Sequence, residues 1–176
     1  MSFVTQLLTE HFASSAASPL AMLLLSCALL WFLVCSTVLF VIDVREHRLP
    51  NRWTGLLFIG GACLLLATTL TAPDDSVFSN RWLMILGGSA AYLLVMFVLH
   101  LLTRAGLGMG DVKLAAGLGL YTGFIGWEAV IAGFVLAFLM GGLQAVYLVV
   151  FKGAKKNTRI AFGPAMLVGG LLTLLM

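Results

Sequence analysis

Five long stretches of this sequence, and a sixth shorter one, contain no Asp, Glu, Lys or Arg. They cover residues 19–42, 54–72, 82–102, 114–126, 129–151 and 160–176. A helix that spans a membrane needs roughly 20 mostly apolar residues, and every stretch except 114–126 is near that length. The sequence therefore predicts an all-α, polytopic membrane protein with about six transmembrane helices.

The composition agrees with this fold class. The 176 residues include ten basic and seven acidic side chains, so 10% of the residues are charged, whereas about 25% of the residues of a soluble domain are charged. Hydrophobic residues make up 61% of the sequence. So many spans leave no room for a separate soluble domain, so we expect residues 1–176 to form a single transmembrane domain. Residues 1–18 carry apolar side chains at helical spacing and predict a short helix on the membrane surface.

The fourth apolar stretch is the shortest. Counted from Asp111 it has 16 residues, which cover about 24 Å as an α-helix. We expect that helix to begin below the membrane surface, or the bilayer to become thinner around it.

The basic residues predict an orientation. Nine of the ten Lys and Arg lie in the segments 43–53, 103–113 and 152–159, which fall on one side of a six-span topology. Such a bias in short loops marks the cytoplasmic side, so both termini are expected outside. No Lys/Arg-rich stripe is present, which argues against nucleic-acid binding. The sequence does not reveal the oligomeric state.

Two acidic residues stand out by their depth in this topology. Asp43 directly follows the first span, and Asp111 begins the short fourth one, so both are expected at the cytoplasmic ends of their helices. An ionisable residue at that depth is a functional candidate. Two facing carboxyl groups suit aspartyl hydrolysis, in which the pair shares one proton. The ionised member takes a proton from water and the protonated member polarises the peptide carbonyl, so neither a metal ion nor another cofactor is needed.

Other interpretations of these acids are open. Asp111 could be the N-cap of its helix, and Asp43 could be an interfacial residue that pairs with Arg45 or Arg48. The two acids could also form a proton relay in a small transporter, although a relay needs further ionisable groups across the bilayer. A structural subunit of a secretion complex would tolerate Asn at both positions.

The residues around the acids resemble a known family. Residues 43–51 read DVREHRLPN, residues 106–114 read GLGMGDVKL, and residues 161–164 read AFGP. These resemble signatures of the type IV prepilin peptidases, membrane aspartyl proteases of the GxGD class. The first is an aspartate before a basic stretch ending in Leu-Pro-Asn, the second is Gly-x-Gly-Asp followed by x-Lys, and the third is Pro-Phe-Gly-Pro before the last span. The resemblance runs from about residue 30 to the last residue.

This resemblance implies an aspartic endopeptidase in the bacterial cytoplasmic (inner) membrane. Its catalytic residues would be Asp43 and Asp111, and its substrates would be prepilin or pseudopilin precursors with a short basic leader before an apolar helix. The long cytoplasmic loop with paired Cys-x-x-Cys motifs is not present, so the resemblance does not extend to N-methyltransferase activity.

Seven further residues of the motifs are expected to support the site or bind substrate: Pro50, Asn51, Gly108, Gly110, Lys113, Gly163 and Pro164. The glycines would let an extended substrate backbone approach the acids. Pro50 would bend the loop and Asn51 would cap the second helix. Lys113 is expected on the opposite helix face from Asp111, where it would reach toward lipid phosphates.

Overall fold

The computed structural model describes residues 18–74, 76, 79–103, 107–152 and 162–176. These residues form six helices and no strand, which confirms the all-α prediction. The helices are α2 (Pro19–Glu46), α3 (Asn51–Thr71), α4 (Trp82–Leu102), α5 (Met109–Ile125), α6 (Trp127–Lys152) and α7 (Gly163–Leu175). The surface helix expected in residues 1–18 lies outside the described residues, apart from residue 18 itself.

Four helices are long and apolar enough to cross a membrane, namely α2, α3, α4 and the Trp127–Leu148 part of α6. The protein is therefore a membrane protein. Helix α7 is also apolar but has only 13 residues, which is shorter than the predicted span 160–176. Its first turn contains Pro164, and proline is favoured there because its missing N–H has no partner in a first turn.

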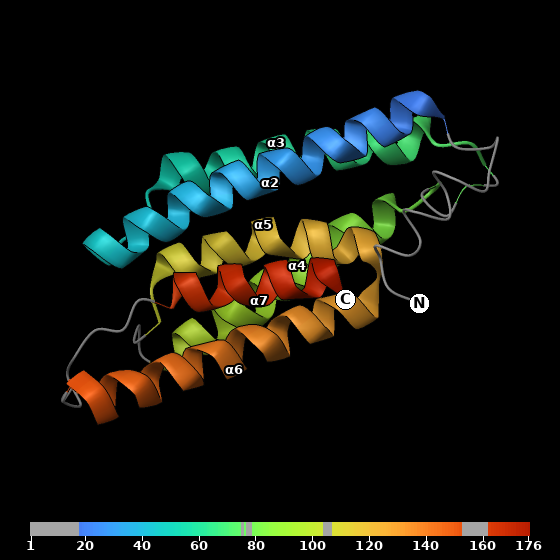
Figure 1. The fold of residues 1–176 in the computed structure, drawn as a ribbon. Coiled ribbons are helices and arrows are strands. Elements are labelled where there is room, and N and C mark those ends of the chain that lie inside the picture. Colours follow the sequence, from blue (N-terminus) through green and yellow to red (C-terminus); the bar gives the residue numbers. More distant parts are fainter. Residues whose placement is uncertain (1–17, 75, 77–78, 104–106, 153–161) are drawn as a thin grey trace.

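The helices run roughly alongside one another (Figure 1). Helices α2 and α3 pack as a pair on one side of α5, while α4 packs on α5, and α6 packs chiefly on α7. At the left of Figure 1, the last turn of α2 lies near the first turns of α3, α5 and α7. We call this the aspartate end of the bundle, because Asp43 and Asp111 lie in these turns.

Helix α5 is the central helix. It packs against α3, α4, α6 and α7, and 13 of its 17 residues are buried. It also reaches α2, because the rings of Tyr121 and Phe32 lie 4.8 Å apart and the Tyr121 hydroxyl donates to the carbonyl of Ala28 at 3.2 Å. A helix enclosed by other helices does not have to match the thickness of the hydrocarbon layer. This explains how a helix of about 26 Å fits beside the longer helices α3, α4 and α6.

Glycine allows α4 and α5 to touch backbone to backbone. A Cβ added to Gly88 would lie 2.6 Å from the Cα of Gly123, and one added to Gly119 would lie 2.6 Å from the carbonyl oxygen of Gly88. Small residues at such crossings let helices pack closely in lipid, where no hydrophobic force brings them together. The contact fixes α5, and with it Asp111, against α4.

Arg81 holds the other end of α5. It precedes α4 and donates from Nη1 to the carbonyls of Phe124 (2.8 Å) and Ile125 (2.7 Å). The last carbonyls of a helix have no partner within the helix and carry partial negative charge. Arg81 therefore stabilises the C-terminus of the central helix, and α5 is restrained at both its sides and its end.

Candidate active site

Two buried carboxyl groups lie at the aspartate end. Asp43 lies in the last turn of α2 and is 3% exposed, and Asp111 lies in the first turn of α5 and is 8% exposed. They are close enough for the charge of Asp43 to act on Asp111. The structure thus brings together two acids that are 68 positions apart in the sequence, as their predicted depth suggested. Asp43 is buried, whereas Arg45 and Arg48 are exposed, which argues against the alternative that Asp43 is an interfacial residue.

The end of α2 fixes the position of Asp43. The helix stops at His47, whose left-handed backbone (φ 51°) lets its N–H donate to the Asp43 carbonyl at 2.9 Å. Such a left-handed residue is a common way to end a helix. The chain then reverses through Leu49 and Pro50, and α3 begins at Asn51. Asp43 therefore lies one turn from a sharp reversal that leads directly into the next helix.

The Gly-x-Gly-Asp motif forms the beginning of α5. Gly108 is the N-cap, and Asp111 is the third residue of the helix. The N–H of Asp111 donates to the Gly108 carbonyl at 3.0 Å, and the Asp111 carboxylate interacts with the backbone N–H of Gly108. The Asp111 carboxylate thus makes the half of a capping box that the N3 side chain supplies, while the N–H of Asp111 bonds to a backbone carbonyl because Gly108 has no side chain. The alternative that Asp111 is itself the N-cap is therefore wrong, although its charge suits the first turn.

The start of α7 closes the site from a third side. The backbone N–H of Gly163 interacts with the Asp43 carboxylate, and a Cβ added to Gly163 would overlap Oδ2 of Asp43. The side chain of Leu49 lies between two glycines, because it would lie 3.2 Å from a Cβ on Gly163 and 2.9 Å from one on Gly110. Leu49 thus links the α2–α3 reversal to the beginnings of α5 and α7.

One oxygen of this site has no partner. Oδ2 of Asp43 is buried and makes no hydrogen bond to any described residue. A buried polar atom without a partner costs free energy, and such atoms are rare enough in folded proteins to need an explanation. A site that must bind a polar reactant beside this carboxylate provides one.

Lys113 and Asn51 connect two of the motifs. The Nζ of Lys113 donates to Oδ1 of Asn51 at 2.8 Å. The predicted capping role of Asn51 is wrong, because Pro50 is the N-cap of α3 and no side chain caps that helix. The carbonyl of Pro50 instead accepts from the N–H groups of Trp53 and Thr54. Lys113 therefore has a protein partner that ties the first turn of α5 to the first turn of α3.

Sequence reasoning missed two contributors to this site. Leu49 gave no signal beyond its place in the Leu-Pro-Asn motif. His100 lies with Nδ1 2.6 Å from the carbonyl oxygen of Leu107 and so anchors the residue that directly precedes the Gly-x-Gly-Asp motif. No group of three or more His, Cys, Asp or Glu side chains that could hold a metal ion occurs among the described residues.

Comparison with known proteins bears directly on this arrangement. The sequence profile of the "Type IV leader peptidase family" matches residues 27–146, a range that contains both acids. The chain belongs to the type IV leader peptidase family. Both the fold class and the resemblance of the motifs agree with this membership.

Three curated relatives of this chain are each named "Prepilin leader peptidase/N-methyltransferase". The protein of Aeromonas hydrophila is 30% identical over 84% of this chain and 47% of its own length, and that of Bacillus subtilis is 30% identical over 82% and 53%. The protein of Dickeya chrysanthemi is 33% identical over 85% of this chain and 51% of its own. The chain thus spans about half the length of these relatives. No solved structure gives a significant match.

Proposed function

We propose that this protein is an aspartic endopeptidase that removes the leader from type IV prepilin-like precursors. The observation that carries the proposal is the pair of buried carboxyl groups of Asp43 and Asp111, which come from different helices and interact electrostatically. Membership of the leader peptidase family and the names of its relatives support the substrate class. The N-methyltransferase in those names is not part of the proposal.

The proposed reaction uses the two carboxyl groups as one unit. Like charges this close cannot both ionise cheaply, so the pair holds one proton. The ionised carboxylate accepts a proton from the attacking water, and the protonated member donates a hydrogen bond to the carbonyl of the scissile peptide. The unpartnered Oδ2 of Asp43 is available for that water. The water oxygen bonds to the carbonyl carbon, and the C–N bond then breaks as the carboxyl group that took the proton from water donates it to the nitrogen of the leaving amine. The two carboxyl groups thus supply every proton transfer, so no cofactor takes part.

The supporting residues keep this pair in place. Gly108 contacts Asp111, and Gly163 contacts Asp43. Leu49 packs between the beginnings of α5 and α7 and keeps them at a fixed separation, and Gly110 leaves space for the Leu49 side chain. Lys113 and Asn51 join the neighbouring helix starts. Pro164 is the second residue of α7 and directly follows Gly163. The proposed role of all seven motif residues is positional, since each acts through an acid or through the helix that carries it.

We place the aspartate end on the cytoplasmic side of the bacterial inner membrane. The excess of Lys and Arg in the loops at this end supports that orientation. A precursor anchored by its apolar helix would then present its leader junction at the depth of the acids. The transporter alternative lacks such support, because Asp43 and Asp111 are the only buried carboxyl groups among the described residues and a relay needs further steps.

Co-expression with a type IV prepilin tests the proposal. The wild-type protein should remove the leader, which mass spectrometry of the pilin detects, whereas Asp43→Asn and Asp111→Asn should leave the precursor intact. Asp74→Asn is a matched control, because Asp74 is exposed in the turn after α3, away from the pair. Processing by either variant at the wild-type level would exclude the catalytic pair.

A further inference from the structure

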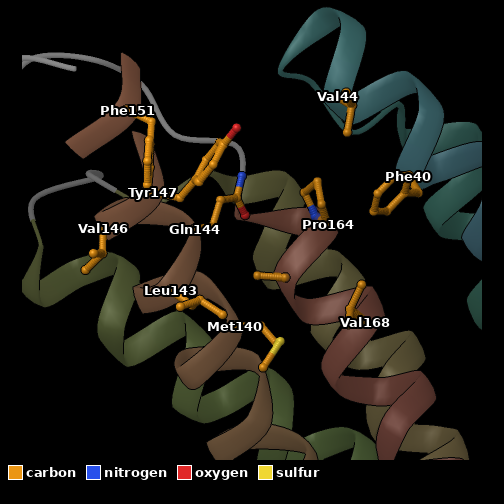
Figure 2. A pocket seen from close by; sticks show the side chains of 11 residues that line it. Phe40, Val44, Met140, Leu143, Gln144, Val146, Tyr147, Phe151, Pro164 and Val168 are labelled. Carbon is orange, nitrogen blue, oxygen red and sulfur yellow. The ribbon is translucent and has the colours of Figure 1, made fainter. Parts of the chain in front are cut away.

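An apolar groove opens beside the active site. It has a volume of about 600 Å³ and lies between α2 and α6, with α7 beneath it. Figure 2 shows Phe40 and Val44 of α2 on one side, Leu143 and Tyr147 of α6 on the other, and Pro164 of α7 between them. The groove is therefore formed by three helices that are separate in the sequence.

The packing of the helices explains why this space is open. Helix α2 packs mainly on α3, and α6 packs mainly on α7. Each of these two walls also contacts α7, but they do not pack closely against each other. Helix α7 begins with Gly163, Pro164 and Ala165, whose small side chains do not fill the space between the walls. The opening is thus a consequence of the same motif that contacts Asp43.

The chemistry of the groove fits an apolar occupant. None of the described residues that line it is charged. Its walls are exposed, with Val44 51% and Leu143 64% accessible. In a membrane such a surface favours close van der Waals packing with another apolar segment.

The groove begins beside the turns that hold Asp43, although neither acid lines it. Val44 directly follows Asp43, and Pro164 directly follows Gly163, which contacts the Asp43 carboxylate. From there the lining extends away from the aspartate end to Phe40 on α2 and to Val168 on α7. A chain whose peptide bond lies at the acids therefore finds the groove immediately beside it.

The length of the groove matches a few turns of helix. On α6 the lining runs from Met140 to Phe151, a separation of 11 residues or about 16 Å along the helix axis. A substrate helix lying along this wall would contact it over about 11 residues, or three turns.

We propose that this groove binds the first turns of the apolar helix that follows the scissile bond of the precursor. This inference rests on the proposed function and adds where the enzyme recognises its substrate. The leader would lie outside the membrane at the aspartate end, the cleaved bond would lie at Asp43 and Asp111, and the helix would continue along α6. A helix that follows the cleaved bond must begin at the acids, whereas a lipid chain does not have to end there.

Photo-crosslinking tests the occupant directly. The photoreactive amino acid p-benzoylphenylalanine replaces Leu143 in the groove or, as a control, Ile131, which is also 64% exposed on α6 but does not line the groove. Both proteins carry Asp111→Asn and are co-expressed with a type IV prepilin, so that the precursor stays uncleaved. Crosslinks from position 143 to the first apolar turns of the prepilin, and none from 131, are expected. Crosslinks only to lipid, only to residues 1–17 or 153–161 of this chain, or equally from both positions would overturn the proposal.

Kinetics provide a second, independent test. Leu143→Trp should raise the KM for detergent-solubilised prepilin by about ten-fold, or 1.4 kcal/mol, with kcat nearly unchanged. Cleavage of a short peptide that spans the junction but lacks the apolar helix should stay within about two-fold of wild type, because it makes no groove contact. Ile131→Trp should change neither. Equal KM for wild type and Leu143→Trp would overturn the groove assignment, whereas a wild-type protein that cleaves neither substrate would overturn the proposed function itself.

Discussion

Replacing Gly163 by alanine places a methyl group where the Asp43 carboxylate lies. The added Cβ would overlap Oδ2 of Asp43 and would lie 3.2 Å from both the Asp43 Cγ and the Cδ1 of Leu49. Leu49 can rotate away, but the Asp43 backbone is held by helix α2 and by the hydrogen bond from His47 to its carbonyl. The carboxyl group itself must therefore move.

The size of the effect follows from this displacement. Restoring ordinary contact requires the carboxyl group to move by on the order of 1 Å, and a misplacement of that size in an active site costs about 10²-fold in rate. Two opposing effects decide the change in stability. Overpacking costs about 1 to 3 kcal/mol, while replacing a helical glycine by alanine returns up to about 1 kcal/mol. The free energy of unfolding should thus fall by about 0 to 3 kcal/mol.

The assay is the initial rate of leader removal by purified protein in detergent, with the melting temperature measured on the same samples. Gly55→Ala and Gly142→Ala are matched controls, because a Cβ at either position meets nothing within 4 Å. Gly108→Ala should show an intermediate loss, since its Cβ would lie 3.1 Å from Oδ2 of Asp111. Wild-type cleavage by a folded Gly163→Ala protein would refute the claim that Gly163 positions Asp43.

Four other substitutions test the framework around the site. Gly119→Ala should lower the free energy of unfolding by about 1 to 3 kcal/mol, because its Cβ meets the backbone of Gly88; denaturation in detergent measures this, and an unchanged midpoint would contradict the close α4–α5 contact. Arg81→Gln should lower the melting temperature, since two carbonyls of α5 lose a charged donor; equal melting of Arg81→Gln and wild type would count against this role. Lys113→Met and Asn51→Leu should each reduce cleavage by about five-fold, or about 1 kcal/mol. Because the two side chains share one hydrogen bond, the double variant should lose no more than either single variant. Additive losses would show that the two residues act separately.

The main features of the fold and of the site could be predicted from the pattern of charge. Membrane-spanning helices must be long, apolar and nearly free of charge, so their positions can be predicted directly from the sequence. The same rule makes Asp43 and Asp111 conspicuous, because few other acids lie next to a span. Their common depth then follows from counting helices, and the electrostatic interaction between them in the structure agrees with it.

Features that depend on three-dimensional contacts could not be predicted in this way. The short length of α5 predicts that the helix begins below the membrane surface or that the bilayer thins around it, because its enclosure by neighbouring helices is not visible in a local pattern. Asn51 was assigned as a helix cap because asparagine favours that position, but its partner Lys113 lies 62 positions away. Leu49 is one leucine among many, and only the packing of two glycines around it gives it a role.

The most direct test of the central claim compares initial rates of leader cleavage for Asp43→Asn, Asp111→Asn and the double variant, all purified in detergent and confirmed as folded. When two residues act as one catalytic unit, the enzyme loses most of its rate if either residue is removed. We predict that each single variant loses at least about 10³-fold and that the double variant loses no more. Cleavage by either single variant within about ten-fold of wild type, or a double variant whose loss is the product of the two single losses, would contradict a shared catalytic pair.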